Sequence, residues 1–288
     1  MTDSKLAIVR DTLGTPSCDL GSAVIYTGDC LDFLRSLPSD IVNLTITSPP
    51  YNIGKKYEAV REVDEYVSWC GEWMSEIYRV TAPDGAFWLN LGYIPVPNKA
   101  KALPLPYLLW DKSPFQLVQE TVWNYGAGVA AKTMFSPRNE KYLWYVKTLL
   151  AYTFNLDAVR DPNVKYPNQK KHGKIRVNQI GKNPTDVWQI PKVTTGENMT
   201  GRRASPERTP HPAQFPEAVI DRIIKACSNP GDLVLDPFIG SGTTAVVAVA
   251  NGRQAVGFEI RPEYVSVACA RMRKRLQAMS QGTLFEVT

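Results

Sequence analysis

A serine, two prolines and a tyrosine follow directly after an apolar, strand-like segment at residues 41–47. Pro49 and Pro50 have no backbone N–H, so a central strand cannot continue through them. The Ser48 hydroxyl and the Pro49 carbonyl can accept hydrogen bonds, and the Tyr51 ring offers a flat apolar surface. The pattern predicts acceptors and an aromatic ring placed at the end of a buried strand, with an ordinary Pro-Pro turn as the alternative.

A glycine-containing stretch at residues 232–248 carries the second chemical signal. A buried strand ends in an acidic residue, enters a glycine turn and becomes a helix. This is how α/β folds hold a cofactor beyond the carboxyl ends of their strands. The glycines would let the backbone approach a ligand, and the hydroxyls of Ser241, Thr243 and Thr244 would cap the helix start. We expect the pocket to be formed by Asp236, Pro237, Phe238, Gly240, Ser241, Gly242, Thr243, Thr244 and Glu259.

The residues around these glycines limit which ligand fits. No Lys follows them, so the stretch is not a P-loop, and residues 243–245 stand where the dinucleotide-binding fingerprint has its third glycine. The next strand ends at Glu259, whose carboxylate can accept hydrogen bonds from both hydroxyls of a ribose. The pattern therefore predicts a nucleoside with a small zwitterionic or carboxylate arm, rather than a pyrophosphate, against the alternative of an ordinary tight turn.

Alternating strands and helices must position these two stretches. Apolar runs bounded by turn residues predict strands, and apolar residues at three- and four-residue spacing predict helices. A turn is expected at residues 83–85, Pro-Asp-Gly. Such alternation implies an α/β fold with a mostly parallel, twisted sheet and helices on both faces. The expected strands are 23–27, 41–47, 86–92, 141–147, 232–236 and 254–260, and the expected helices are 30–38, 66–78, 216–228, 241–252 and 262–279.

Positive charge is concentrated in one segment. The 288-residue chain has a net charge of +5, but residues 160–208 hold eleven Lys and Arg against four Asp and Glu, so the remainder is at −2. The same segment is rich in turn-forming residues. It predicts a loop-rich surface that binds a polyanion, with a solvated loop as the alternative. The candidate contact residues are Lys170, Lys171, Arg176, Arg202 and Arg203.

The remaining composition, 44% apolar and 21% charged, indicates a soluble globular protein. The longest apolar runs are shorter than the roughly 20 residues that span a bilayer, and the N-terminus lacks the apolar core of a signal peptide. The five cysteines are odd in number and lack metal-ligand spacing, so we expect no zinc site. Reduced cysteines in a prokaryotic cytoplasm are the simplest expectation.

Residues 46–52, ITSPPYN, and residues 236–244, DPFIGSGTT, together resemble the two signature motifs of the S-adenosylmethionine-dependent DNA amino-methyltransferases. These enzymes methylate exocyclic nitrogens of cytosine or adenine. The motif order, with Pro-Pro-Tyr first, is similar to that of the circularly permuted beta class. The resemblance covers nearly the whole chain except the basic segment, where such enzymes carry a variable target-recognition region.

The resemblance implies a Rossmann-like methyltransferase fold, S-adenosylmethionine as cofactor and double-stranded DNA as substrate. It divides the chain into a catalytic half (1–150), a target-recognition insert (151–210) and a cofactor-binding half (211–288). It further implies the modification enzyme of a restriction–modification system, with a restriction endonuclease encoded nearby as a candidate partner.

Two weaker likenesses add cofactor contacts. Residues 211–216, HPAQFP, resemble the segment that contributes to the methionine side of the pocket, which brings in His211 and Gln214. Residues 28–34, GDCLDFL, resemble an N-terminal motif whose acidic residue, here Asp29, lies at the cofactor or base pocket. For His211 the alternative is a residue at a helix N-terminus without a ligand contact.

The resemblance also gives residues 48–51 a chemical role. An exocyclic amine is a poor nucleophile because its lone pair is delocalised into the ring, and acceptors for both N–H groups favour the more tetrahedral amine of the transition state. Ser48 and the Pro49 carbonyl would be these acceptors, Pro50 would fix the backbone, and Tyr51 would stack on a flipped-out base. Methyl transfer would then be a direct displacement, after which the amine is expected to lose its proton to water.

Ser48 favours cytosine N4 as the target, because the resembling adenine enzymes usually carry Asp or Asn there. The continuation Tyr51-Asn52 also resembles adenine-modifying members, so N6-adenine methylation is the alternative. A catalytically inactive DNA-binding protein on the same scaffold is an alternative of another class, although the glycines, Glu259 and the Pro-Pro-Tyr group are all present. RNA methylation is a further alternative, since a basic segment does not distinguish RNA from DNA.

Overall fold

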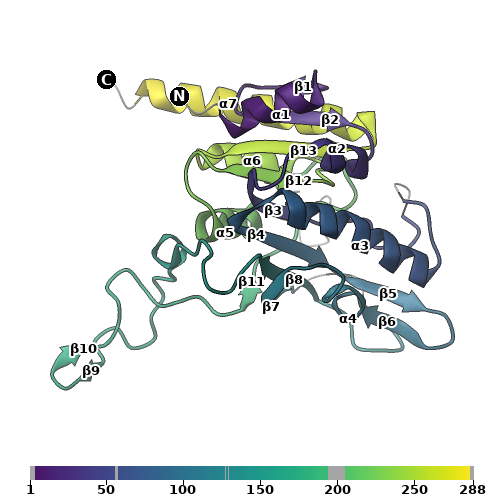
Figure 1. Ribbon diagram of the computed structural model, residues 1–288. Helices are drawn as coiled ribbons and strands as arrows, with labels where there is room; N and C mark the ends of the chain where they lie inside the picture. Colours follow the sequence, from purple (N-terminus) through teal and green to yellow (C-terminus); the bar gives the residue numbers. More distant parts are fainter. Residues whose placement is uncertain (1–3, 56–57, 127, 129, 194–204, 286–288) are drawn as a thin grey trace.

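The apolar runs form a nine-stranded mixed sheet in the computed structural model, which describes residues 4–285 apart from 56–57, 127, 129 and 194–204 (Figure 1). Most neighbouring strands are parallel, whereas β1–β2, β4–β8 and β7–β8 pair antiparallel. The predicted α/β class and mostly parallel sheet are therefore confirmed. Across the sheet the strands are β1 (Cys18–Asp19), β2 (Ala23–Thr27), β13 (Gln254–Glu259), β12 (Leu233–Asp236), β3 (Val42–Thr47), β4 (Thr81–Leu91), β8 (Asn139–Val146), β7 (Gln116–Asn124) and β11 (Val187–Gln189).

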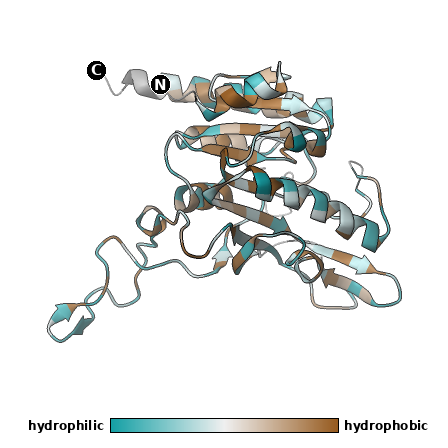
Figure 2. Ribbon diagram, in the orientation of Figure 1, coloured by the Kyte–Doolittle hydropathy of each residue, from teal (hydrophilic) through white to brown (hydrophobic). Residues whose placement is uncertain are grey.

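Two separate apolar clusters cover the two faces of this sheet. Side chains alternate between the faces along each strand, so Val24 and Tyr26 lie in one cluster and Ala23 and Ile25 in the other. In Figure 2 brown ribbon is prominent in the central strands between the helical layers. One face is covered by α1 (Lys5–Leu13), α2 (Cys30–Ser36), α3 (Val63–Val80) and α4 (Pro106–Leu109), and the other by α5 (Glu217–Cys227), α6 (Thr243–Ala250) and α7 (Pro262–Phe285).

The turn expected at residues 83–85 is wrong, because these residues lie inside β4. The pairing of β3 with β4 shifts register between Val42 and Leu44, which accommodates the irregular stretch as a bulge. Gly85 is needed there, since a Cβ would come within 2.8 Å of the Asn43 carbonyl oxygen. After β4 the chain forms the hairpin β5 (Tyr93–Val96) and β6 (Ala100–Pro104), which sequence periodicity did not indicate.

The chain leaves the sheet toward the basic segment at the amino ends of the parallel strands, whereas the glycine turn lies at their carboxyl ends. The chain enters this segment after Val146, the last residue of β8. Val146 pairs with Ala86, near the amino end of the regular part of β4, because β8 runs antiparallel to β4. A short 3-10 helix, η1 (Leu156–Val159), contacts α5, and the chain then extends as an arm carrying β9 (Lys170–Lys171) and β10 (Lys174–Ile175) (Figure 1). It returns as β11, which joins the main sheet beside β7. The proposed boundaries of the insert stay a prediction.

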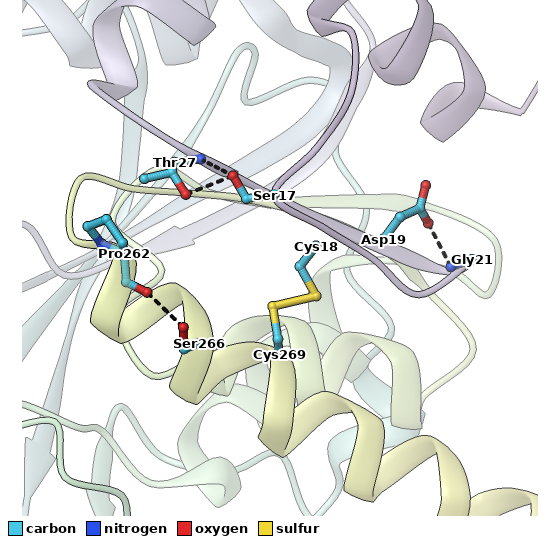
Figure 3. Close-up of a disulfide and its surroundings, with 8 residues drawn as sticks. All are labelled: Ser17, Cys18, Asp19, Gly21, Thr27, Pro262, Ser266 and Cys269. Atoms are coloured by element: carbon cyan, nitrogen blue, oxygen red, sulfur yellow. Dashed lines mark hydrogen bonds between the residues drawn. A yellow bond between two sulfur atoms is a disulfide. The ribbon is translucent and has the colours of Figure 1, made fainter.

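The cysteines correct one expectation. Cys18 in β1 and Cys269 in α7 form a disulfide that joins the first strand to the last helix (Figure 3). The remaining three, Cys30, Cys70 and Cys227, are free and buried. A separation of 251 residues left no spacing signal for this pair, and the expectation of reduced cysteines overlooked it.

In the part of the chain that the structure describes, no helix is both long and apolar enough to cross a bilayer. Within the same residues no cluster of His, Cys, Asp or Glu has the arrangement of a metal site.

Candidate active site

The serine–proline motif (residues 48–51) and the glycine turn lie side by side at the carboxyl edge of the sheet. Ser48 follows β3, and Asp236 ends the neighbouring parallel strand β12. The buried Thr47 hydroxyl donates a hydrogen bond of 2.7 Å to Asp236 Oδ1. This bond links the two motifs although 189 residues separate them in the sequence. Their shared edge is where α/β folds bind ligands, as the sequence predicted.

The Ser48 side chain begins a short chain of hydrogen bonds. Its hydroxyl donates to Tyr51 Oη at 3.0 Å, and Tyr51 Oη lies 3.0 Å from both Asn90 Oδ1 and Glu140 Oε2. Asn90 is near the end of β4, and Glu140 is near the start of antiparallel β8, so both lie at the same edge. The proton of Ser48 is therefore directed inward, while its oxygen lone pairs can receive a donor from a ligand.

The diproline is held by the protein interior. The Pro50 carbonyl accepts a hydrogen bond of 2.8 Å from the hydroxyl of Tyr66 on α3. Pro49 is buried, and among the described residues no donor reaches its carbonyl. The Ser48 hydroxyl and the Pro49 carbonyl thus remain the two candidate acceptors, and their role toward an amine stays a prediction.

Tyr51 is fixed by both its ring and its hydroxyl. A Cβ on Gly92 would come within 2.8 Å of the Tyr51 ring, so the glycine makes room for it. Burial, and then the charge of Glu140, raise the pKa of Tyr51 well above its ordinary value, which keeps the hydroxyl protonated at neutral pH. The side chain is partly exposed, and its stacking on a base stays a prediction.

The two glycines of the turn are required by the protein itself. Gly240 has a φ of +50° and Gly242 a φ of +80°, the left-handed region that favours glycine. A Cβ on Gly240 would come within 3.0 Å of His211 Nε2, and one on Gly242 within 2.8 Å of the Ala268 Cβ. The backbone can approach a ligand here because no side chain is tolerated.

The expected caps of α6 are wrong. Gly242 is the N-cap, and no side chain in the described chain caps this helix. The Thr244 hydroxyl instead donates to Asp236 Oδ2 at 2.6 Å, and Thr243 Oγ1 accepts from the Arg271 guanidinium at 2.8 Å. Ser241 Oγ lies 3.4 Å from the same guanidinium. Hydrogen bonds to charged groups are stronger than those to a backbone N–H, which explains why these hydroxyls are used there.

Asp236 connects strands rather than facing solvent. It is 1% exposed and accepts hydrogen bonds from the hydroxyls of Thr47 and Thr244 and from the Phe238 N–H. Burial raises its pKa to about 6, although the three hydrogen bonds oppose that rise. Phe238 packs edge-on against Trp69 and Trp73, and Pro237 is buried. The ligand roles of all three residues stay predictions.

Glu259 ends β13 beside the glycine turn. Its Oε2 accepts from the Gly240 N–H and its Oε1 from the Arg261 N–H, both at 3.0 Å. Burial raises the pKa of the carboxyl, and the two backbone bonds oppose this rise. Each oxygen keeps a lone pair for a further donor, so the carboxylate can still accept two ribose hydroxyls, as proposed from the sequence.

His211 and Gln214, which a weaker likeness assigned to the cofactor, lie in different surroundings. The His211 ring lies over Gly240 and packs edge-on against Tyr264, with ring centroids 4.4 Å apart. Burial lowers the pKa of His211 to about 4, so the ring is neutral at pH 7. The Gln214 side chain holds its own loop, because its Oε1 accepts from Thr209 and its Nε2 donates to the Glu207 carbonyl. Cofactor contact by either residue stays a prediction.

Asp29 caps α2 and lies at the same sheet edge. Its carboxylate accepts from the Leu31 N–H at 2.8 Å, and the preceding Gly28 N–H donates to the Glu259 carbonyl at 3.0 Å. Its side chain is exposed next to the end of β13, a position compatible with the predicted pocket contact.

The predicted DNA contacts that the structure describes lie away from the motifs. Lys170 and Lys171 form β9, and Arg176 follows β10, on the arm that extends from the far edge of the sheet (Figure 1). Arg202 and Arg203 lie outside the described residues. A cleft of about 730 Å³ lies nearer the motif, between residues 60–63 and the β5–β6 hairpin, and Arg61, Lys99 and Lys101 line it.

Sequence reasoning missed three polar residues of the site. Asn90 and Glu140 carry the hydrogen-bond chain from Tyr51. Arg271 joins the start of α6 to α5 through Thr243 and Glu217, at 2.8 and 2.6 Å. The sequence offered one signal for Glu140, an acidic residue next to the apolar run of β8. To place it beside Tyr51 one must also know that β8 is antiparallel, which a sequence pattern does not supply.

The sequence profile of a family described as DNA methylase (N6_N4_Mtase) matches residues 42–270, which include both motifs. The chain belongs to this family of N4-cytosine and N6-adenine DNA methyltransferases. Its match begins at β3 and continues into α7, so it includes the link between Thr47 and Asp236.

Relatives of this DNA methyltransferase are similar over most of the chain. It is 58% identical to the Type II methyltransferase M.ScaI of Streptomyces caespitosus over 277 residues, 96% of this chain and 90% of that protein. It is 37% identical to the Type II methyltransferase M.BglII of Bacillus subtilis, covering 85% of this chain and 67% of that protein. It is 36% identical to the DNA adenine methyltransferase YhdJ of Escherichia coli K12, covering 86% of this chain and 82% of that protein.

Solved structures share the fold of this methyltransferase at low sequence identity. The cytosine-N4-specific PvuII DNA methyltransferase superposes with a TM-score of 0.69 at 23% identity, and the superposition covers 89% of this chain and 88% of that chain. A protein of Thermus thermophilus described as a DNA modification methylase, in complex with S-adenosyl-L-methionine, superposes with a TM-score of 0.60 at 20% identity. This superposition covers 87% of this chain and 93% of that chain. The Rossmann-like methyltransferase fold expected from the motifs is confirmed.

Proposed function

We propose that this DNA methyltransferase transfers a methyl group from S-adenosylmethionine to the exocyclic N4 amino group of a flipped-out cytosine in double-stranded DNA. The observation that carries the proposal is the placement of Ser48. Its hydroxyl is oriented by Tyr51 and lies at the sheet edge that the glycine turn shares through the Thr47–Asp236 bond. Because the Ser48 proton is donated to Tyr51, the Ser48 oxygen is free to accept a hydrogen bond from an amine N–H.

The residues of the glycine turn fit the cofactor. Bound S-adenosylmethionine would supply an electrophilic methyl group. Glu259 offers a carboxylate to the ribose hydroxyls, and the side-chain-free backbone at Gly240 and Gly242 permits a close approach. The neutral His211 ring beside Gly240 adds an uncharged surface for the methionine arm.

The protein acts on the amine chiefly through pre-placed acceptors. Ser48 Oγ and the Pro49 carbonyl would receive the two N–H groups, which pulls the nitrogen toward the tetrahedral form and exposes its lone pair. The anchors of Tyr51 and Pro50 hold these acceptors in place before the base arrives. Their positions therefore need little reorganisation during transfer.

A base inside a duplex cannot reach this edge, so the enzyme must extrude it. Unstacking costs a few kcal/mol, which stacking on Tyr51 and contacts to phosphates would offset. The basic residues around the cleft of the β5–β6 hairpin line the same cleft as Asn52, next to the motif, and those of the arm would contact DNA farther along.

Methylation of adenine N6 is the second candidate, favoured by the 36% identity to a DNA adenine methyltransferase. The Asn52 side chain weakens the sequence argument for it. Its amide bonds the Arg61 backbone at 2.8 and 2.7 Å, so this residue shapes its own loop instead of facing an amine. Cytosine therefore remains the proposed base.

The relatives named as Type II methyltransferases favour a place in a restriction–modification system. Duplex DNA is the proposed substrate and a restriction endonuclease the proposed partner. Methylation of duplex DNA and of structured RNA with tritiated S-adenosylmethionine tests the substrate. We expect label in the duplex and none in RNA. Label confined to RNA, or no transfer with either polymer, would reject the proposal, the latter in favour of an inactive DNA-binding scaffold.

A further inference from the structure

The proton that the amine loses during methylation needs an acceptor. A methylated exocyclic amine is strongly acidic while it still carries both original protons. The neutral Ser48 hydroxyl cannot keep such a proton, because a protonated alcohol is far more acidic still. Ser48 is, however, bonded to Tyr51, and Tyr51 to the carboxylate of Glu140, by contacts of 3.0 Å each.

We propose that Glu140 receives, through Tyr51 and Ser48, the proton that the target amine releases. The inference rests on the function proposed for this same site. Glu140 touches no substrate in this scheme, so it is a positioning residue that orients the Tyr51 and Ser48 hydroxyls and accepts a proton through them.

The transfer balances. The lone pair of the amine forms the N–C bond, and the C–S bond breaks with its electron pair left on sulfur. The released amine proton moves to Ser48 Oγ as the Ser48 proton moves to Tyr51 Oη and the Tyr51 proton moves to Glu140 Oε2. The sulfonium and carboxylate charges disappear together, and both hydroxyls end as they began.

The neighbouring groups single out Glu140 as the acceptor. Asn90 also contacts the Tyr51 hydroxyl, but an amide is too weak a base to hold the proton. Asp236 is buried close by, but its hydrogen bonds go to Thr47, Thr244 and a backbone N–H instead of Ser48. The chain of bonds from Ser48 therefore reaches an ionisable acceptor at Glu140.

The surroundings of Glu140 suit a base. Burial raises the pKa of its carboxyl above the ordinary value, whereas hydrogen bonds from Tyr51 and Asn90 and the charge of Lys192 oppose this rise. The other titratable groups that sense its charge are the hydroxyls of Tyr93, Tyr125 and Tyr142. A carboxylate with a raised pKa is a better proton acceptor, yet protonation in mild acid disables it.

The test measures the single-turnover rate of methyl transfer to duplex DNA from pH 4.5 to 8, a range that starts at the ordinary pKa of Glu because burial raises the pKa of Glu140 above it. The wild-type rate should fall toward acid as Glu140 is protonated. Glu140→Gln keeps the side-chain shape, and Tyr51→Phe keeps the ring. Each should slow transfer roughly 100-fold or more at pH 7.5 and abolish the acid decline. The double variant should be no slower than either single variant, because both interrupt one chain.

Tyr142→Phe is the matched control, since among the described residues its buried hydroxyl meets no hydrogen-bond partner although it lies near Glu140. Its rate and pH profile should match those of the wild type. A wild-type rate and acid decline in Glu140→Gln or Tyr51→Phe would overturn the inference. So would a slower rate with the acid decline intact, which would indicate orientation without proton transfer. If the wild-type protein methylates no DNA, the proposed function itself fails.

Discussion

The Ser48 hydroxyl is the group on which the proposed chemistry most depends. Ser48→Ala removes one acceptor from the amine while the glycine turn is unchanged, so affinity for S-adenosylmethionine should be unaltered. Turnover should fall roughly a hundredfold, as for the loss of one oxyanion-type partner. Calorimetry and single-turnover rates measure the two effects. Ser280→Ala, on the exposed surface of α7, is the control. Equal rates in both variants would remove Ser48 from the mechanism.

Glu259 is the residue on which cofactor binding should depend most. Glu259→Ala removes the proposed acceptor of two ribose hydroxyls, and two hydrogen bonds to a charged acceptor contribute roughly 2–4 kcal/mol. We expect S-adenosylmethionine binding without DNA to weaken accordingly in calorimetry. Glu263→Ala removes an exposed carboxylate four residues away and should bind as the wild type does. Unchanged affinity in Glu259→Ala would show that the ribose lies elsewhere.

Asp236 should give stability a distinctive pH dependence. Its pKa is about 6 in the folded protein against 3.8 in a free Asp, so the folded state binds more protons between these values. Its contribution to the free energy of unfolding must therefore decrease as pH rises, by about 1 kcal/mol from pH 5 to 7. His211, with a lowered pKa, has the opposite sign over pH 4–6.5.

Asp236→Asn tests this assignment by removing the titrating group. Urea unfolding at pH 5, 6 and 7 should show that stability rises more steeply with pH in the variant than in the wild type, because the opposing contribution of His211 remains. Parallel curves for the two proteins would mean that the Asp236 pKa is not raised.

Among the elements, the turn from β12 into α6 depends most on one glycine. Gly242→Ala places a Cβ against Ala268 at a positive φ, whereas Gly231→Ala has a similar φ of +87° and nothing within 4 Å. Both variants incur the backbone cost of roughly 1–2 kcal/mol, and Gly242→Ala should lose at least about 1 kcal/mol more through the clash. Thermal unfolding compares them. Equal losses would show that the turn relaxes freely.

Patterns in the sequence predicted the elements that hold the motifs. β2 was expected at its observed bounds, 23–27, because turn residues flank a buried apolar run. The position of Ser48 at the end of β3 followed from the prolines in the same way. Local sequence patterns did not predict the features that depend on which strands pair with each other. Residues 83–85 form a bulge because β3 lies beside them, and Glu140 reaches Tyr51 from 89 residues away only because β8 is antiparallel.

For the whole molecule, the distribution of charge predicts how DNA is held. Lys170 and Lys171 are exposed on the arm, where Lys170→Gln and Lys171→Gln together should flatten the slope of log affinity against log salt by about one unit per lost phosphate contact. Arg273→Gln with Lys274→Gln, on exposed positions of α7, is the control of equal charge. If only the α7 pair changes the slope, the duplex lies along α7 and not on the arm.

The product nucleoside tests the central claim most directly. Duplex DNA methylated with tritiated S-adenosylmethionine is digested to nucleosides and separated by chromatography, with Ser48→Ala in parallel. We predict label in N4-methylcytosine for the wild type and roughly a hundredfold less for the variant. Label in N6-methyladenine would contradict the assignment to cytosine, and label in 5-methylcytosine would contradict the amine mechanism altogether.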